Sequence, residues 1–228
     1  MHNEKKDTDI SALEVVSTLK NYNTFVIDIM TKNMKFGRVL DFGCGYGEFA
    51  NQLNKMGYDC DGVEVNLKAI SKAKELGVKI FSGLNELKRR YPIVTSLNVL
   101  EHIEDDEKVL KDLFEIIEDN GTLILYLPAS LAAWTDMDLQ VGHHRRYSKK
   151  MIIEKLKNAG FEVIGASYKD FGGWLILIIL KTLKIKPKFN LKLLQLYDKF
   201  VFPLIKYLDI FGSHIIGKNV LVVARVVR

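Results

Sequence analysis

Few cysteines, few prolines and no long apolar run mark this chain, and each shortage excludes a class of protein. The 228 residues include two cysteines, without a Cys-x-x-Cys or Cys/His pattern, which argues against a disulfide framework and a structural zinc site. Apolar runs such as Trp174–Leu180 are far shorter than the ~18 residues of a membrane span. The first residues also lack the apolar stretch of a signal peptide. We therefore expect a globular, cytoplasmic protein with no metal site.

Acidic residues are scarce in one part of the chain, residues 170–218. This segment holds eight lysines, three aspartates and no glutamate, a surplus of +5 that equals the net charge of the whole chain. It also contains eight aromatic residues. A basic and aromatic segment on an otherwise neutral body indicates a surface with a function of its own.

Outside that segment, strand-like apolar runs alternate with helical patterns, which is typical of a doubly wound α/β sheet. We expect a mostly parallel, seven-stranded, Rossmann-like sheet, with residues 1–36 as an N-terminal helical arm and 37–228 as one domain. Within that domain, residues 170–218 form a helical insertion before the last strand. The expected strands are 38–42, 61–65, 78–81, 93–98, 122–127, 161–168 and 219–227, and the expected helices are 10–35, 48–56, 67–76, 105–118 and 148–159.

A glycine-rich loop follows the first expected strand and precedes a helix, with the sequence Asp-Phe-Gly-Cys-Gly-Tyr-Gly over 41–47. Glycine permits a tight turn and a close approach of the backbone to a ligand, and the helix N-terminus offers free N–H groups. Glu64 ends the next strand, where a carboxylate can accept both hydroxyls of a ribose. The pattern predicts a nucleoside-bearing cofactor across the ends of these two strands.

The residues around the loop favour one cofactor. A dinucleotide fingerprint that begins at Gly43 needs glycine at position 48, where Glu48 stands, and no phosphate-loop pattern is present. This disfavours an NAD-dependent oxidoreductase. The acid before the glycines, Asp41, suits a cationic ligand better than a phosphate. S-adenosylmethionine, which carries a sulfonium, an ammonium and a ribose, fits these features.

With these residues the chain resembles the class I S-adenosylmethionine-dependent methyltransferases. The stretch 41–47 is similar to their first motif, and Val-Leu-Glu-His at 99–102 is similar to a segment of the small-molecule branch. Gly-His-His-Arg-Arg-Tyr at 142–147 resembles an uncharacterised subgroup of that branch. The resemblance implies cofactor contacts from Tyr22, Asp41, Gly43, Cys44, Gly45, Glu64, Val65, Asn98 and Val99.

Histidines after the fifth expected strand are candidates for the acceptor side. A hydroxyl acceptor needs a base, and histidine titrates near neutral pH, so His143 and His144 are the candidate catalytic residues. Trp134, Arg146 and Tyr147 are candidate substrate-binding residues. The alternative is a capping loop, in which Ser148 begins a helix and Arg145 and Arg146 pair with Asp136 and Asp138.

The insertion allows two interpretations. Residues 191–211 place Leu and aromatic residues on one helical stripe and Lys192, Lys199 and Lys206 on another, with Pro203 as a kink. Such a pattern is typical of a helix in a membrane interface, and it equally suits a lid or a homodimer face. A nucleic-acid partner is not expected, because the segment lacks arginine.

These observations predict methyl transfer from S-adenosylmethionine to a small-molecule acceptor, with a glycan or a lipid-linked intermediate as the finer hypothesis. The alternative is an S-adenosylmethionine-binding or scaffold protein without catalysis. Turnover of an acceptor distinguishes the two.

Overall fold

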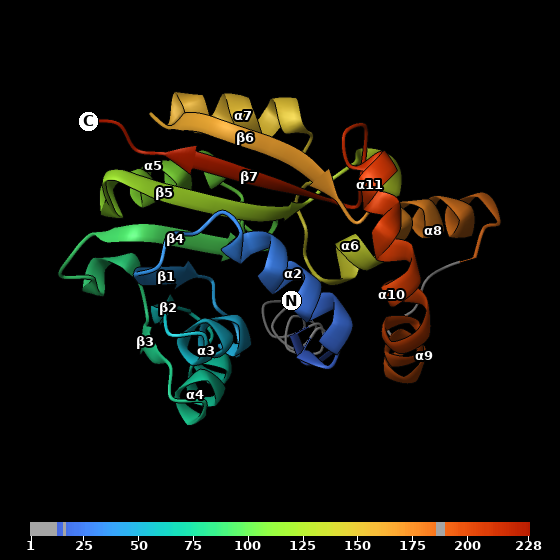
Figure 1. The fold of residues 1–228 in the computed structure, drawn as a ribbon, viewed down its shortest axis with the longest axis horizontal. Helices are drawn as coiled ribbons and strands as arrows, with labels where there is room; N and C mark the ends of the chain where they lie inside the picture. Colours follow the sequence, from blue (N-terminus) through green and yellow to red (C-terminus); the bar gives the residue numbers. More distant parts are fainter. Residues whose placement is uncertain (1–12, 16, 186–189) are drawn as a thin grey trace.

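A mixed seven-stranded sheet organises the molecule in the computed structural model, which describes residues 13–15, 17–185 and 190–228 (Figure 1). The strand order is β3-β2-β1-β4-β5-β7-β6. Strands β1 to β5 run parallel, and β7 is antiparallel to β5 and β6. The strands are β1 (Arg38–Phe42), β2 (Asp59–Val63), β3 (Lys79–Phe81), β4 (Tyr91–Leu97), β5 (Ile117–Pro128), β6 (Glu162–Lys169) and β7 (Asn219–Arg225). The predicted fold class is confirmed.

Helices cover both faces of the sheet and bury two apolar clusters. On one face, α5 and α7 pack residues such as Leu110 and Leu156 against the sheet. On the other face, α2 and α3 contribute residues such as Met30 and Leu53. The helices are α2 (Lys20–Thr31), α3 (Glu48–Lys55), α4 (Leu67–Glu75), α5 (Asp106–Ile116), α6 (Asp136–Gln140), α7 (Lys149–Asn158), α8 (Phe171–Thr182), α9 (Leu191–Leu196), α10 (Phe202–Ile205) and α11 (Asp209–Gly212).

Several predicted boundaries are wrong; the strand expected over 61–65, for example, is Asp59–Val63, so Glu64 follows the strand instead of ending it. The helix expected over 10–35 is not continuous: the backbone leaves the helical conformation at Leu19 (φ −85°, ψ 77°) and α2 begins at Lys20. The first residues of that helix lie outside the described part of the chain. The helix expected over 105–118 ends at Ile116, because Ile117 is fully buried and pairs with Tyr91 as the first residue of β5.

The insertion between β6 and β7 forms short helices at the end of the sheet toward which β6 points (Figure 1). After α8, the segment continues through α9, a π-helical turn over Tyr197–Val201, α10, a 3₁₀ turn over Lys206–Leu208 and α11. The single stripe predicted over 191–211 is therefore divided among short pieces, and Pro203 lies in the first turn of α10. Among the described residues, no helix combines the length and apolarity needed to cross a membrane.

Candidate functional site

The glycine loop between β1 and α3 has a shape that only glycine supports without strain. Gly43, Gly45 and Gly47 have φ values of 74°, 53° and 78°, in the left-handed region. A Cβ atom at Gly43 would lie 2.4 Å from Val99 Cγ2, and one at Gly45 would lie 2.9 Å from Leu13 Cδ2. The side chains of Val99, just after β4, and of Leu13, in the N-terminal segment, therefore lie close to the loop backbone.

Glu64 connects this loop to the end of β2. Its Oε2 accepts the N–H of Gly45 at 2.9 Å, and its Oε1 accepts the N–H groups of Val65 and Asn66 at 2.8 Å. The carboxylate is therefore fixed at the boundary between the two strand ends. Val65 follows with 78% of its side chain exposed, so an apolar surface lies beside the carboxylate.

Asp41 lies buried beneath the loop. The hydroxyl of Thr95 donates to its Oδ1 at 3.0 Å. Burial raises the pKa of Asp41 to about 7. The Thr95 hydrogen bond opposes this shift, and the charge of Glu64 adds to it. A cation placed next to this carboxyl would favour its ionised form. Burial likewise raises the pKa of the neighbouring Cys44 thiol, which favours the neutral thiol over the nucleophilic thiolate.

A polar chain crosses the end of the sheet between β4, β7 and α2. Asn98 has a φ of 51°, in the left-handed region that few residues other than glycine and asparagine adopt. The amide of Asn219 donates to Asn98 Oδ1 at 3.3 Å, and the hydroxyl of Tyr22 lies 3.4 Å from Asn219 Oδ1 and 3.2 Å from the hydroxyl of Tyr126. Sequence reasoning missed Asn219 and Tyr126. For Asn219, its position as a polar residue at the start of the apolar strand β7 was the available signal.

His143 is held by an ion-paired carboxylate. Its Nδ1 lies 2.8 Å from Asp138 Oδ1, and Arg146 donates to both oxygens of Asp138 at 2.8 Å and 3.1 Å. Burial alone would raise the pKa of Asp138, but the hydrogen bonds from His143 and Arg146 hold it at about 2. Because an ionised carboxylate only accepts, the proton of neutral His143 sits on Nδ1 and Nε2 is left with a free lone pair.

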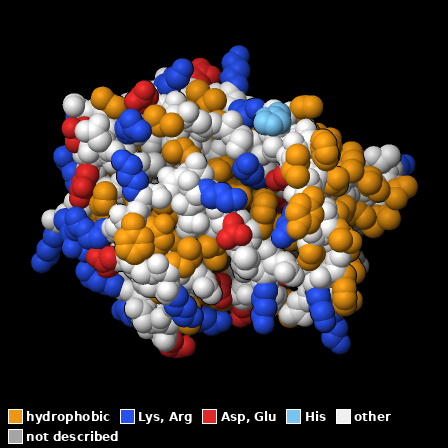
Figure 2. Space-filling model, in the orientation of Figure 1, with side chains coloured by type: hydrophobic (Ala, Val, Ile, Leu, Met, Phe, Trp, Pro, Cys, Tyr) orange, Lys and Arg blue, Asp and Glu red, His pale blue; other side chains and the backbone are white. Residues whose placement is uncertain are grey.

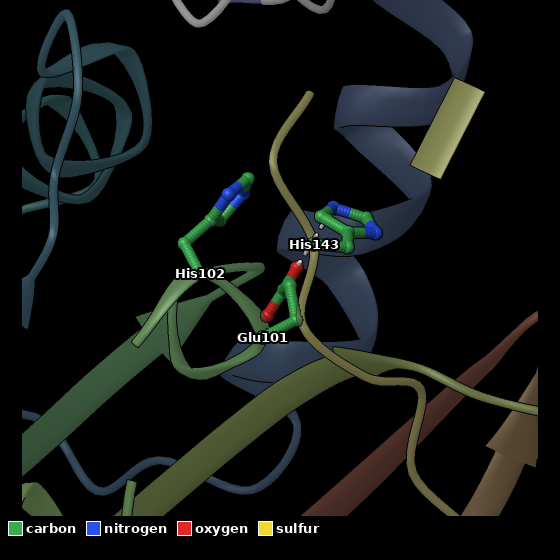
Figure 3. A group of neighbouring side chains, drawn as sticks. All are labelled: Glu101, His102 and His143. Carbon is green, nitrogen blue, oxygen red and sulfur yellow. Dashed lines mark ion pairs between the residues drawn. The ribbon is translucent and has the colours of Figure 1, made fainter. Parts of the chain in front are cut away.

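Glu101 and His102 lie next to His143 (Figure 3). Glu101 Oε1 is 3.8 Å from His143 Nε2, and the rings of His102 and His143 meet edge to face with centroids 4.7 Å apart. Burial raises the pKa of Glu101 to about 8, and burial together with the two neighbouring histidines lowers that of His102 to about 4.

The same three side chains are the described residues that can hold a metal ion, because one donor atom from each lies within 4.8 Å of the others. Two histidines and a carboxylate are donors that suit a transition metal. The prediction of no metal site stays a prediction, and elemental analysis of the purified protein tests it.

One cavity of about 2660 Å³ joins these groups. Its lining includes the predicted cofactor residues Tyr22, Asp41, Gly43, Cys44, Gly45, Glu64, Val65, Asn98 and Val99, together with His143 and Arg146. The glycine loop, Glu64 and Asp41 therefore line the same cavity as the Asp138–His143 pair.

Three predicted residues are placed elsewhere. Tyr147 is fully buried in the core, where its hydroxyl donates to Asp106 at 2.8 Å. His144 is exposed, and neither it nor the half-buried Trp134 is among the residues that line the cavity. Parts of the capping-loop interpretation also hold, since Ser148 caps α7 and Arg146 pairs with Asp138, whereas Arg145 pairs with Asp106.

Comparison with known proteins gives a family and a fold. Residues 18–166 match the family model described as "Methyltransferase domain". The ubiquinone biosynthesis O-methyltransferase of Rickettsia canadensis is 31% identical over 132 residues, which are 53% of this chain and 55% of that protein. The chain thus matches about half the length of this curated relative.

Two solved structures share the fold at low identity. One is an S-adenosylmethionine-dependent methyltransferase of Thermotoga maritima, with a TM-score of 0.59 and 18% identity over 95% of this chain and 90% of that one. The other is phosphoethanolamine N-methyltransferase 2 of Haemonchus contortus in complex with S-adenosylmethionine, with a TM-score of 0.58 and 19% identity over 91% of this chain and 52% of that one.

Proposed function

This chain belongs to the methyltransferase domain family, and from that premise we propose that it transfers a methyl group from S-adenosylmethionine to an oxygen atom of a small-molecule acceptor. The observation that carries the proposal is the shared cavity, in which a glycine loop with the carboxylates Asp41 and Glu64 faces the Asp138–His143 pair. The glycine loop and its two carboxylates suit the cofactor, and the Asp138–His143 pair suits proton removal from an acceptor.

The residues at the cofactor end fit S-adenosylmethionine by their chemistry. A Cβ atom at Gly43 or Gly45 would lie within 3 Å of the Val99 or Leu13 side chain, so glycine lets the loop keep its tight turn at the cavity wall. Asp41 offers a carboxylate for the ammonium group, and Glu64 offers one for the ribose hydroxyls. Asn98 and Val99 stand at the end of β4, beside the polar chain to Tyr22. When bound, the cofactor supplies an electrophilic methyl group on a sulfonium.

His143 is the proposed general base. Asp138 accepts a hydrogen bond from the Nδ1–H group at 2.8 Å, so the lone pair of Nε2, which lies 3.8 Å from Glu101 Oε1, can take the proton of an acceptor hydroxyl. Arg146 keeps Asp138 ionised and correctly oriented through two hydrogen bonds. Positioned proton transfer of this kind contributes about 10²- to 10⁴-fold to a rate. Arg146, which also lines the cavity, is proposed to contact the acceptor from the same loop.

The acceptor is proposed to be a lipid-linked intermediate rather than a free glycan, and the protein to act at a membrane surface. All three acids of the insertion accept hydrogen bonds from backbone N–H groups: Asp170 from Gly173, Asp198 from Asn21 and Tyr22, and Asp209 from Asp170 and Phe171. The lysines Lys181, Lys184, Lys192 and Lys199 are exposed. An exposed basic surface without exposed acids suits anionic lipid headgroups.

A calorimetric titration with S-adenosylhomocysteine and a turnover assay test the proposal together. We expect tight, one-to-one binding of the product and methylation of an acceptor. Binding without turnover of any acceptor from a native cell extract would support the non-catalytic alternative, and absence of binding would overturn both.

A further inference from the structure

Helix α8 presents two different apolar faces. Gly173, Ile176, Leu177 and Leu180 line the cavity, and their spacing of three and four residues places them on one side of the helix. Leu175 and Ile179 lie on another side and are 38% and 47% exposed. The helix is fixed at its start, where the indole of Trp174 donates to Ser130 at 3.0 Å and the Asp170 carboxylate accepts the Gly173 N–H.

Residues of α9 and of the π-helical turn line the same cavity as α8. Cavity-lining residues of α9 and the π-helical turn are Leu193, Leu194, Leu196, Tyr197, Phe200 and Val201. Leu193 and Phe200 remain 63% and 58% exposed, so the protein itself does not cover them. None of the described lining residues from Gly173 to Val201, a range in which 186–189 are not described, carries a charge, and the side chain of Asn190 accepts the Leu193 N–H as a helix cap.

The cavity is also larger than one cofactor requires. Sites for drug-sized molecules occupy roughly 300–1,000 Å³, whereas this cavity measures about 2660 Å³. Asp41, Glu64 and Asn98 line the cavity at the strand ends, whereas its described lining residues from α8 and from 190–201 are uncharged and mostly apolar. A ligand that fills both parts must be polar at one end and apolar along the rest.

From this arrangement, and resting on the proposed function, we infer that the methyl acceptor carries a long hydrocarbon chain that lies between α8 and residues 190–201 while its polar end reaches His143. We call this part of the cavity the chain channel, lined by Ile176, Leu177, Leu180, Leu193, Leu194 and Tyr197. A straight acyl chain and a branched isoprenoid chain share the required chemistry, and the experiment separates them.

Displacement of a fluorescent probe, 11-(dansylamino)undecanoic acid, measures occupancy of the chain channel in the 228-residue protein saturated with S-adenosylhomocysteine. The competitors are the monophosphates of n-alkanols of six to fifteen carbons and of geraniol and farnesol, each below its micellar concentration. We expect the inhibition constant to fall about fourfold per added methylene, the factor that corresponds to ~0.8 kcal/mol. Tighter binding of either series at equal carbon number identifies the chain type. An inhibition constant that does not change with chain length would overturn the inference.

Two neighbouring positions of α8 provide matched variants. Leu180→Asp, on the cavity side, should weaken probe binding at least tenfold, whereas Ile179→Asp, on the exposed side, should leave it within twofold. Leu180→Trp keeps the position apolar but narrows the chain channel. Affinity should therefore stop rising at a shorter competitor chain length than in the unmodified protein. Equal losses of probe affinity in the two Asp variants would contradict the channel, as would an unchanged limiting chain length in Leu180→Trp.

Titration of the same variants with S-adenosylhomocysteine separates this inference from the proposed function. Because Leu180 lies in the chain channel and the cofactor residues lie at the strand ends, cofactor affinity should be kept in Leu180→Asp. Loss of chain binding with retained cofactor binding supports the channel. Chain binding without any cofactor binding would refute the proposed function and leave the channel in place.

Discussion

Each carboxylate of the site has a different environment, and the differences fit different tasks. Asp138 is ion-paired and has its pKa held at about 2, so it orients His143 without taking part in proton exchange. Asp41 is buried with a pKa near 7, so a cationic ligand can ionise it. Glu64 accepts hydrogen bonds from three backbone N–H groups and is fixed in place before any ligand arrives.

Replacement of Glu64 by Gln tests the ribose contact. Hydrogen bonds to a charged group contribute about 1.5–3 kcal/mol each, so the loss of the charge should weaken S-adenosylhomocysteine at least tenfold in calorimetry. Glu162→Gln, at an exposed position of β6, is the matched control and should bind like the unmodified protein. Equal affinity of the two variants would refute the role of Glu64.

Stability against pH tests the environment of Asp41. Its folded-state pKa of about 7 lies above the ordinary value of 3.8, so between these values the folded protein holds a proton that the unfolded chain has lost. Stability therefore falls as pH rises through this range. Asp41→Asn removes the penalty, and its melting temperature should exceed that of the unmodified protein at pH 8 and approach it below pH 4.

The same variant should bind S-adenosylmethionine more weakly at pH 8, because it offers no negative charge to the ammonium group. A variant that is less stable than the unmodified protein at pH 8, or that binds the cofactor equally well, would contradict this account of Asp41.

One side chain of the insertion caps the N-terminal helix α2. Asp198, in the π-helical turn, accepts the N–H groups of Asn21 and Tyr22 at 3.0 Å and 2.8 Å. N–H groups in the first turn of a helix have no acceptor within the helix, and Leu19 provides no side-chain cap for α2. The contact places Tyr22 against Phe202 and at the polar chain of the site. The insertion thus positions a cofactor-side residue that is distant in sequence.

Asp198→Ala removes this cap and should destabilise the protein by about 1–2 kcal/mol, which corresponds to a fall in melting temperature of a few degrees. Asp112→Ala, at an exposed position of α5, is the control. Because Tyr22 loses its support, the affinity for S-adenosylhomocysteine should also fall in the Asp198 variant only. Unchanged stability would show that the cap is not significant.

Local patterns predicted most of the elements because each is encoded by neighbouring residues. The glycine loop, the apolar run of β5 and the Ser148 cap all follow from short-range rules. The start of α2 could not be predicted, because its cap is Asp198, 177 positions away. The fixed orientation of His143 likewise depends on Asp138 and Arg146, whose pairing needs the folded loop.

On the face drawn in Figure 2, exposed hydrophobic side chains gather over α8 to α11. Leu204, Ile210, Phe211 and Ile215 are 72%, 68%, 78% and 78% exposed. Contiguous exposed apolar surface of this kind is unusual for a monomer and indicates a partner. The exposed lysines nearby favour an anionic lipid surface, and a homodimer is the competing prediction.

Sedimentation with vesicles tests the membrane surface. Binding to vesicles that contain phosphatidylglycerol should weaken as salt rises, and replacement of Lys184, Lys192 and Lys199 by Gln should reduce it at low salt. The control replaces Lys108, Lys111 and Lys157, on α5 and α7. Protein that stays in the supernatant at low salt and sediments as a dimer in ultracentrifugation would favour the homodimer.

Transfer of a labelled methyl group tests the central claim most directly. The protein is incubated with methyl-tritiated S-adenosylmethionine and a native cell extract, and the radioactivity of the small-molecule and lipid fractions is counted. We predict label in the lipid fraction with the unmodified protein and at least a hundredfold slower labelling with His143→Gln, which retains S-adenosylhomocysteine binding. Label no higher than in a sample without protein would contradict the account, as would equal rates for the two proteins.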